Sequence, residues 1–277
     1  MPVKLGKALM VTPQGLAYMI FVIALRLVVA TDWATGVQTR ANALGSELGR
    51  RIHVSILHET PHVVRVDGLL TDAECASIIE EAERSELLQP SRVKSDHQDE
   101  YVEDHSVRSS FEAVWAPDGV LALSDDSLPV IAARRLHRIM GEMGNPDHLE
   151  GPKVVRYDEQ QFYAQHHDFF SQPDMHPTGQ RLTTALLYLS SLDADDGGCT
   201  VFPRLGNLRV VPQAGSVLIW RNTDSDGLRD YATLHGSEPL QPGTTGKKWI
   251  VNFFYRQGSY YQVALKAAGL ADDKPEL

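Results

Sequence analysis

The chain has 277 residues, of which 43% are hydrophobic and 22% charged, and this composition indicates a folded domain rather than a disordered chain. Its formal net charge of -10 argues against broad nucleic-acid binding, because phosphate backbones are held by clustered Lys and Arg side chains. Cys75 and Cys199 are the only cysteines, so a disulfide scaffold and a four-thiolate zinc site are both excluded, while one bridge between the two stays open.

Residues 1–30 differ in character from the rest of the chain. Lys4 and Lys7 precede an apolar stretch over residues 16–30 that only Arg26 interrupts. This order predicts a secretory signal peptide or a signal anchor, and a plain buried helix is the alternative. We therefore expect the protein in the secretory pathway or at the endoplasmic reticulum membrane, with cleavage of the segment left open.

The remainder of the chain divides into three parts by composition. Residues 31–60 mix small, charged and apolar residues without a strong period, and we interpret them as a linker with some helix. The folded domain is predicted over residues 61–258. Residues 259–277 are predicted to form a C-terminal tail.

The first half of this domain has the pattern of strands and capped helices. Residues 62–67 alternate between apolar and polar as a strand does, and residues 70–74 provide a capping signal for a helix over 75–88. A polar stretch over 98–118 indicates a loop or an edge strand. A second helix is predicted over 128–143, before a Gly-Asn-Pro sequence that would end it.

The second half of the domain is rich in short β-type segments. Residues 181–189, 216–220 and 249–255 are enriched in Thr, Val, Ile, Leu and aromatic residues, and clusters such as Asp195–Gly198 separate them. Several short strands with turns between them predict a jelly-roll or a barrel.

His166 and Asp168 are the first candidate metal ligands. Side chains two residues apart on a strand project to the same face, whereas His167 points to the other face. A third ligand from a distant strand would complete a two-His, one-carboxylate set, which leaves positions open on iron, and His235 is the candidate. A His-x-Asp pair alone is weak evidence, so the surrounding residues decide the interpretation.

A longer pattern extends on both sides of this pair. Its first part consists of Arg156, Tyr157, Gln161, Tyr163, His166, Asp168, Phe170, Arg181, Leu186–Leu189 and Gly197–Pro203. Its second part consists of Asn222, Asp230, Leu234–Gly236, Gly243 and Lys248–Trp249, and residues 70–75 and 108–110 precede it. In order and spacing this pattern resembles the prolyl 4-hydroxylase family of iron(II)- and 2-oxoglutarate-dependent dioxygenases, over residues 63–256 with a catalytic core over 154–256.

The resemblance implies both a fold and an activity. The fold is α+β with a mostly β core, a double-stranded β-helix (jelly-roll) with supporting N-terminal helices. The activity is procollagen-proline 4-dioxygenase-like hydroxylation of peptidyl proline with release of succinate and CO2. It requires Fe(II) held by the catalytic residues His166, Asp168 and His235, together with 2-oxoglutarate, O2 and L-ascorbate.

The resemblance also implies roles for five further residues. Lys248 would pair with the distal carboxylate of 2-oxoglutarate, which the hydroxyls of Tyr157 and Thr200 help to bind. Tyr163 and Arg181 match positions on the substrate side of the pocket. The plainer alternatives are a solvated surface position for the lysine or the arginine, and ordinary core packing for the others.

Three departures from the family pattern affect these assignments. Gln160 stands where the family has glycine, so we expect a different turn there. Two extra residues within 244–246 make Lys247 a rival to Lys248, which we prefer because it directly precedes a tryptophan as in the family. Phe254 replaces a second tryptophan and lacks an indole donor.

The substrate and the oligomeric state are open at this point. A proline-containing peptide or protein is the expected partner, nucleic acid is not, and residues 1–30 provide the expected membrane anchor. One alternative is a related 2-oxoglutarate oxygenase that acts on another residue or a small molecule, because substrate loops vary around a shared metal site. A non-catalytic binding or sensing relative is the second alternative, and retention of the three ligands and the lysine argues against it.

Overall fold

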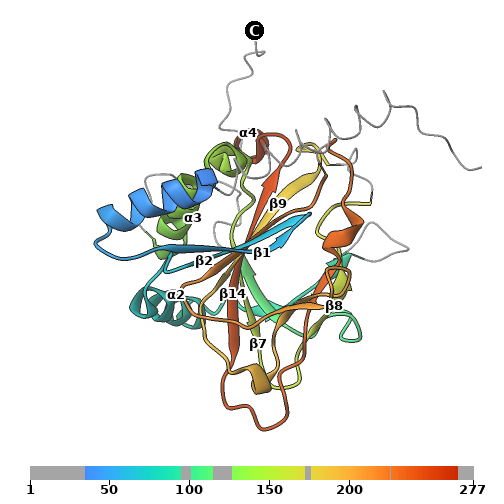
Figure 1. Cartoon of the computed structure of the whole chain (residues 1–277). Coiled ribbons are helices and arrows are strands. Elements are labelled where there is room, and N and C mark those ends of the chain that lie inside the picture. The colour runs from blue at the N-terminus through green and yellow to red at the C-terminus, as the bar shows by residue number, and fades with distance from the viewer. Residues whose placement is uncertain (1–34, 95–100, 115–126, 172–175, 225, 268–277) are drawn as a thin grey trace, which may run out of the picture.

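The computed structural model describes residues 35–94, 101–114, 127–171, 176–224 and 226–267. They form two antiparallel sheets with helices on one side, as Figure 1 shows. The larger sheet has the order β1 (His53–Glu59), β2 (His62–Asp67), β12 (Val217–Arg221), β9 (Arg181–Tyr188), β14 (Lys248–Arg256), β7 (Lys153–Tyr157), β6 (Phe111–Val114) and β3 (Gln89–Pro90). The smaller sheet has the order β11 (Leu208–Val210), β10 (Thr200–Phe202), β13 (His235–Ser237) and β8 (Tyr163–His166). The predicted α+β jelly-roll with a mostly β core is confirmed.

The remaining elements are short. The strands β4 (Val93–Lys94) and β5 (Tyr101–Val102) pair as a separate two-stranded ribbon. The helices are one over residues 35–47, α2 (Asp72–Arg84), α3 (Leu128–Met140) and α4 (Tyr260–Ala267), with 3-10 turns at Gly141–Gly144, Pro146–His148, Ala194–Asp196 and Tyr231–Thr233. The predicted helices and strands are thus present, and strand ends differ from prediction by one residue at most.

The central strands of the larger sheet are buried on both faces, and their side chains alternate between two hydrophobic cores. On β7, Val154 packs into the core shared with the helices, whereas Val155 and Tyr157 pack into the core between the two sheets. On β9, Leu187 and Leu186 divide in the same way. Because successive side chains of a strand point to opposite faces, the sheet supports the helices with one face and the space between the sheets with the other.

Residues 35–59 do not form the linker expected over 31–60. They contain the helix over 35–47, whose Val37, Ala41 and Leu44 are buried in the helix-side core, and strand β1, which pairs with β2. The expected presence of some helix is confirmed, but its packing into the domain was not predicted, because the buried stripe has only one apolar residue per turn. The folded domain therefore begins before residue 61.

Two other expectations concern the chain ends and the cysteines. The predicted targeting segment, residues 1–30, lies outside the described residues and stays a prediction. No helix in the part of the chain that the structure describes is long and apolar enough to cross a membrane. Cys75 and Cys199 are both buried and free, so the bridge between them is not formed.

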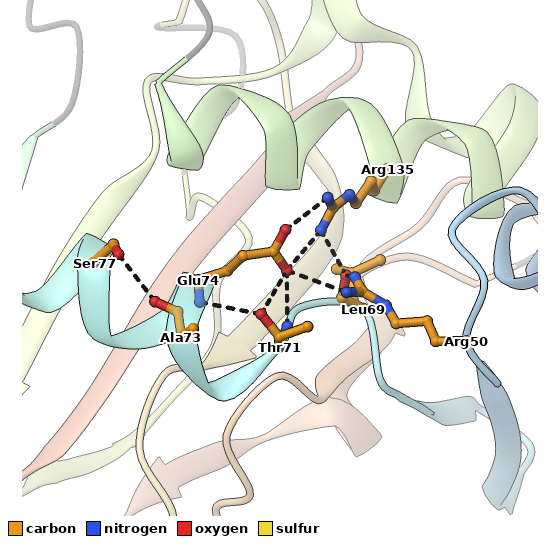
Figure 2. Close-up of polar contacts among 7 residues, drawn as sticks. All are labelled: Arg50, Leu69, Thr71, Ala73, Glu74, Ser77 and Arg135. Carbon is orange, nitrogen blue, oxygen red and sulfur yellow. Dashed lines mark hydrogen bonds and ion pairs between the residues drawn. The ribbon is translucent and has the colours of Figure 1, made fainter.

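A capping box formed by Thr71 and Glu74 begins α2, and its glutamate also binds α3. The Thr71 hydroxyl accepts from the Glu74 backbone N–H at 3.2 Å, and the Glu74 carboxylate accepts from the Thr71 backbone N–H at 2.8 Å (Figure 2). The same carboxylate accepts hydrogen bonds from Arg135 at 2.7 and 2.9 Å and from Arg50 at 3.3 Å. Partial burial alone would raise the pKa of Glu74, but Arg135, the Thr71 N–H and Arg50 outweigh it and lower the pKa to about 2.

We expect Glu74→Gln to lower the free energy of unfolding by about 2 kcal/mol at pH 7, since a depressed carboxyl pKa stabilises the fold and partial exposure screens part of the effect. The stabilisation is present above the unfolded pKa of the carboxyl, near 4.5, and is lost as pH falls toward 2. Urea unfolding followed by circular dichroism at pH 7 and pH 3.5 measures both effects. Glu47→Gln is the control, because its ion pair with Arg138 is exposed and should contribute little. Equal losses in the two variants would contradict the assignment.

Candidate metal centre and co-substrate pocket

The three predicted metal ligands meet where β8 and β13 pair. His166 ends β8 and lies opposite His235, the first residue of β13, while Asp168 follows β8 by two residues. Asp168 Oδ1 lies 3.6 Å from His166 Nε2, and its Oδ2 lies 3.5 Å from His235 Nε2. One donor atom from each residue falls within 4.8 Å of the others, so the three form a metal-sized cluster.

Both imidazole rings are oriented by backbone carbonyls. Nδ1 of His166 lies 2.9 Å from the Ala164 oxygen, and Nδ1 of His235 lies 3.0 Å from the Thr233 oxygen. A carbonyl oxygen can only accept a hydrogen bond, so each Nδ1 carries the proton. The lone pair of each Nε2 therefore faces the side of Asp168, as metal ligation requires.

Two side chains that the sequence did not single out for this role orient Asp168. Thr184, on β9, donates its hydroxyl to Asp168 Oδ2 at 2.7 Å. Asn222 donates its side-chain amide to Thr184 Oγ1 at 2.9 Å. All three side chains are buried, so this relay fixes the carboxylate from behind. Asn222 is part of the family pattern in the sequence, whereas Thr184 has no sequence signal beyond its place in a predicted strand.

The protonation states of the cluster suit a divalent cation. Burial lowers the pKa of His235 to about 4, so its imidazole is neutral at neutral pH. Burial alone would raise the pKa of Asp168, but His235 and His166 hold it well below its usual range, so the carboxyl is ionised. Two imidazoles and one carboxylate with open positions are the ligand set of non-haem Fe(II) oxygenases, and the residues present therefore fit iron.

A cavity of about 440 Å³ extends from this cluster, and we call the end lined by the buried residues Lys248, Tyr157 and Thr200 its closed end. The Lys248 side chain is fully buried, donates to Ser237 Oγ at 2.7 Å and lies 5.2 Å from the centre of the Tyr157 ring. Thr200 also lines this end and accepts a hydrogen bond from the Tyr188 hydroxyl at 2.8 Å. The structure thus brings the three predicted co-substrate residues, Lys248, Tyr157 and Thr200, together.

Lys247 lies outside this cavity. Its side chain is 46% exposed, and its ammonium lies 4.0 Å from Glu83 and 3.9 Å from Asp158. The two lysines face opposite ways because Lys248 begins β14 and is paired with Tyr157, whose side chain points into the inner core. The two extra residues before them are therefore accommodated in the loop and leave the strand register unchanged.

The open end of the cavity is built from stacked aromatic and guanidinium groups. Tyr163 stacks on His166 with ring centres 3.6 Å apart. Arg181 lies 3.7 Å from the centre of the Phe254 ring and forms two hydrogen bonds with Glu150, at 2.6 and 2.7 Å. The two predicted substrate-side residues, Tyr163 and Arg181, therefore line the same cavity as the metal cluster.

The turn at Gln160 keeps a left-handed conformation, with a φ of 62°. Its backbone N–H donates to the Leu240 oxygen at 3.0 Å, and the following N–H, of Gln161, donates to the Asp158 oxygen at 3.0 Å. Glycine would adopt this φ without strain, whereas glutamine adopts it at a cost of about 1 kcal/mol.

Comparisons with known proteins agree with this geometry. Residues 152–256 match the sequence model of the 2OG-Fe(II) oxygenase superfamily. Prolyl 4-hydroxylase 5 of Arabidopsis thaliana is 31% identical over 218 residues, which cover 71% of this chain and 68% of that protein.

Two solved structures share the fold. The viral collagen prolyl hydroxylase of Paramecium Bursaria Chlorella virus-1, in its 2OG complex, superimposes with a TM-score of 0.52 and 25% identity, covering 70% of this chain and 95% of that one. A prolyl hydroxylase from Trichoplax adhaerens, in complex with a hypoxia inducible factor peptide fragment, gives a TM-score of 0.54 over 80% of this chain and 90% of that one. At 14% identity, the second likeness concerns the fold alone.

A jelly-roll that presents two histidines and one carboxylate beside a deep cavity defines an Fe(II)- and 2-oxoglutarate-dependent dioxygenase. The enzyme uses Fe(II), 2-oxoglutarate and O2. Within this class, the chain belongs to the prolyl 4-hydroxylase family. The family resemblance predicted from the sequence is confirmed.

We expect Asp168→Ala to weaken metal binding by more than the roughly 10- to 100-fold that loss of an outer hydrogen-bond partner costs, and Thr184→Val to weaken it within that range. Equilibrium dialysis with Mn²⁺, a redox-stable substitute for Fe²⁺, measures both, and circular dichroism checks the fold. His167→Ala is the control, because this neighbouring ring stacks on Phe169 and lies outside the three-residue metal cluster. Metal binding by Asp168→Ala at the wild-type affinity would remove Asp168 from the site.

Proposed function

We propose that this enzyme hydroxylates prolyl residues in peptide or protein substrates. The observation that carries the proposal is a single cavity with Lys248 at its closed end, the metal cluster beside it and the Tyr163–Arg181 wall at its open end. The substrate class is supported by the Arabidopsis relative and by the viral enzyme, which are a prolyl 4-hydroxylase and a collagen prolyl hydroxylase.

His166, Asp168 and His235 would hold Fe(II) as a set of two imidazoles and one carboxylate. When bound, Fe(II) and 2-oxoglutarate supply the oxidising power that places one atom of O2 in a substrate C–H bond and the other in succinate, with release of CO2. The Thr184–Asn222 relay holds the Asp168 carboxylate in its orientation.

The closed end of the cavity is equipped to bind the distal carboxylate of 2-oxoglutarate. Lys248 uses one of its three N–H donors on Ser237, so two remain for the co-substrate. Thr200 accepts its hydrogen bond from Tyr188 and can therefore donate its own hydroxyl proton to a carboxylate. The Tyr157 phenol lines the same end, and these groups together fix the co-substrate by charge-assisted hydrogen bonds.

The open end positions the substrate. Tyr163 is held by its stack on His166, and burial raises the pKa of its phenol to about 12, so it remains a hydroxyl donor at neutral pH. The Arg181 guanidinium is fixed between Glu150 and Phe254 and cannot swing out to solvent. A rigid aromatic and guanidinium surface beside the metal orients a substrate ring and excludes water from it.

The purified protein should convert proline-containing peptides to products 16 Da heavier, the mass of one added oxygen atom, and release one succinate per hydroxylation. Mass spectrometry with fragment sequencing, in the presence of Fe(II), 2-oxoglutarate and L-ascorbate, locates the modified residue. Matched peptides with alanine in place of proline are the control, and omission of L-ascorbate tests the expected need for it. Succinate release without modification of any proline would overturn the proposal.

We expect Lys248→Ala to weaken 2-oxoglutarate binding by about 30-fold or more, because truncating one partner of a buried charge pair costs about 2 to 5 kcal/mol. Burial lowers the pKa of Lys248 to about 7, so the affinity for 2-oxoglutarate should fall as pH rises above 7, where the free lysine loses its proton. Calorimetric titration of the Mn²⁺-loaded protein between pH 6.5 and 8.5 measures both effects.

The matched control for this lysine is Lys247→Ala, which should preserve both the affinity and its pH dependence, since that side chain lies outside the cavity. Lys248→Ala should bind weakly at every pH, with little of the wild-type pH dependence. A larger loss in Lys247→Ala than in Lys248→Ala would show that the wrong lysine had been assigned.

A further inference from the structure

A second lysine, Lys153, lies on the inner face of the larger sheet at the other end of the cavity. It is paired with Asn252 across β7 and β14, and both residues line the cavity. Four pairs further along the same strands, Tyr157 is paired with Lys248. A separation of four positions on a strand corresponds to about 13 Å. Lys153 therefore lies beyond the reach of the carboxylate that Lys248 binds.

The side chains of Lys153 and Asn252 are half-buried polar groups without a hydrogen-bond or ion-pair partner among the described residues. Across the described ranges, neither side chain takes part in a hydrogen bond or an ion pair. Glu112 and Glu150 attract the Lys153 ammonium electrostatically, but both carboxylates are already in ion pairs. Glu112 pairs with Arg108 at 3.0 Å, and Glu150 pairs with Arg181 at 2.6 Å. Holding an ammonium half-buried without a partner is unfavourable, and burial lowers the pKa of Lys153 accordingly.

The described residues that line the cavity carry an excess of positive charge. Its described lining contains Arg92, Arg108, Lys153, Arg181 and Lys248, against the single carboxylate of Asp168. This excess stands out in a chain whose formal net charge is -10. The co-substrate accounts for Lys248, the metal for Asp168, and internal ion pairs for Arg108 and Arg181. Arg92 is exposed to solvent, so the half-buried ammonium of Lys153 is the charge left without a counterpart among the described lining residues.

We propose that Lys153 and Asn252 form a specificity subsite for the carboxylate of an acidic residue next to the target proline. The ammonium and the side-chain amide both offer N–H donors to the same space, and a carboxylate accepts from both. Because the metal cluster and Lys153 line the same cavity, we place the acidic side chain on a residue that flanks the proline. This inference rests on the proposed prolyl hydroxylation and names the substrates that the enzyme selects.

Paired peptides test the subsite directly. Two acetylated and amidated peptides carry either Glu or Gln at the positions flanking one proline and are otherwise identical. The wild-type enzyme should prefer the Glu peptide by about tenfold in kcat/KM, the factor that corresponds to 1.4 kcal/mol for a charge-assisted hydrogen bond. The preference should shrink with added salt.

Variants of Lys153 should change this preference in a defined order. The ratio should fall to near one in Lys153→Gln, should invert in favour of the Gln peptide in Lys153→Glu, and should fall partly in Asn252→Leu. Lys247→Gln, which removes an equal charge outside the cavity, should retain the wild-type ratio. A ratio that is the same in the wild type and in Lys153→Gln would overturn the subsite. Reporting a ratio of two substrates excludes a general loss of folding as the explanation.

Binding of fluorescein-labelled versions of both peptides, measured by anisotropy, separates the subsite from the proposed function. Tighter binding of the Glu peptide that depends on Lys153, without hydroxylation of either peptide, would support the subsite and reject prolyl hydroxylation. Hydroxylation of both peptides at rates independent of Lys153 would support the function and reject the subsite. A third peptide has Gln flanks and a free terminal carboxylate directly after the proline. Lys153-dependent preference for it over the Glu peptide would assign the site to a chain end and overturn the side-chain proposal.

Discussion

The pairing of β13 with β8 is the contact on which the metal site depends. It places His235 opposite His166, so that two imidazoles from distant parts of the chain meet one carboxylate. The close approach requires glycine at position 236, because a Cβ there would lie 2.9 Å from the Tyr163 carbonyl oxygen. Any larger residue at 236 would push the strands apart and move His235 away from Asp168. The glycine between the histidine and Ser237 is thus part of the metal site without touching the metal.

The larger sheet positions the residues of the site because its two faces pack into different cores. Trp249 and Val251 of β14 pack into the helix-side core, while Lys248 and Ile250 face the inner side. A slip of one residue would expose the tryptophan to the cavity and turn the lysine toward the helices, so hydrophobic burial on one face fixes the polar groups on the other. Glu74, by tying α2 to α3, stabilises the helical layer that presses on this outer face.

Much of this architecture could be predicted from the sequence, because the site residues lie on strands whose alternation is readable. Residues 62–67 were predicted with the bounds that β2 has, and spacing of two placed His166 and Asp168 on one side of the chain. The preference for Lys248 followed from the tryptophan after it, and the structure places its side chain in the cavity.

What the sequence did not reveal has a physical reason in each case. The packing of the helix over 35–47 depends on a sparse apolar stripe, Val37, Ala41 and Leu44, and on Arg40, which donates to the carbonyl oxygens of Ile139 and Met140. Thr184 has the local pattern of any strand residue, and its bond to Asp168 depends on how β9 lies against the end of β8. The significance of Lys153 likewise depends on which neighbouring carboxylates are already paired. Such partnerships are set by tertiary packing, which a local pattern does not encode.

The inner face of β7 and β14 separates two anion-binding functions by an apolar row. The cross-strand pair of Ile250 and Val155 forms this row. It lies between the pair of Lys248 and Tyr157 and the pair of Asn252 and Lys153. The aliphatic side chains of this row cannot donate a hydrogen bond. A carboxylate is therefore stabilised beside Lys248 or beside Lys153, but not between them. An anionic substrate group held at Lys153 is therefore kept apart from the co-substrate carboxylate, and the repulsion between the two charges is reduced by the distance that the strand imposes.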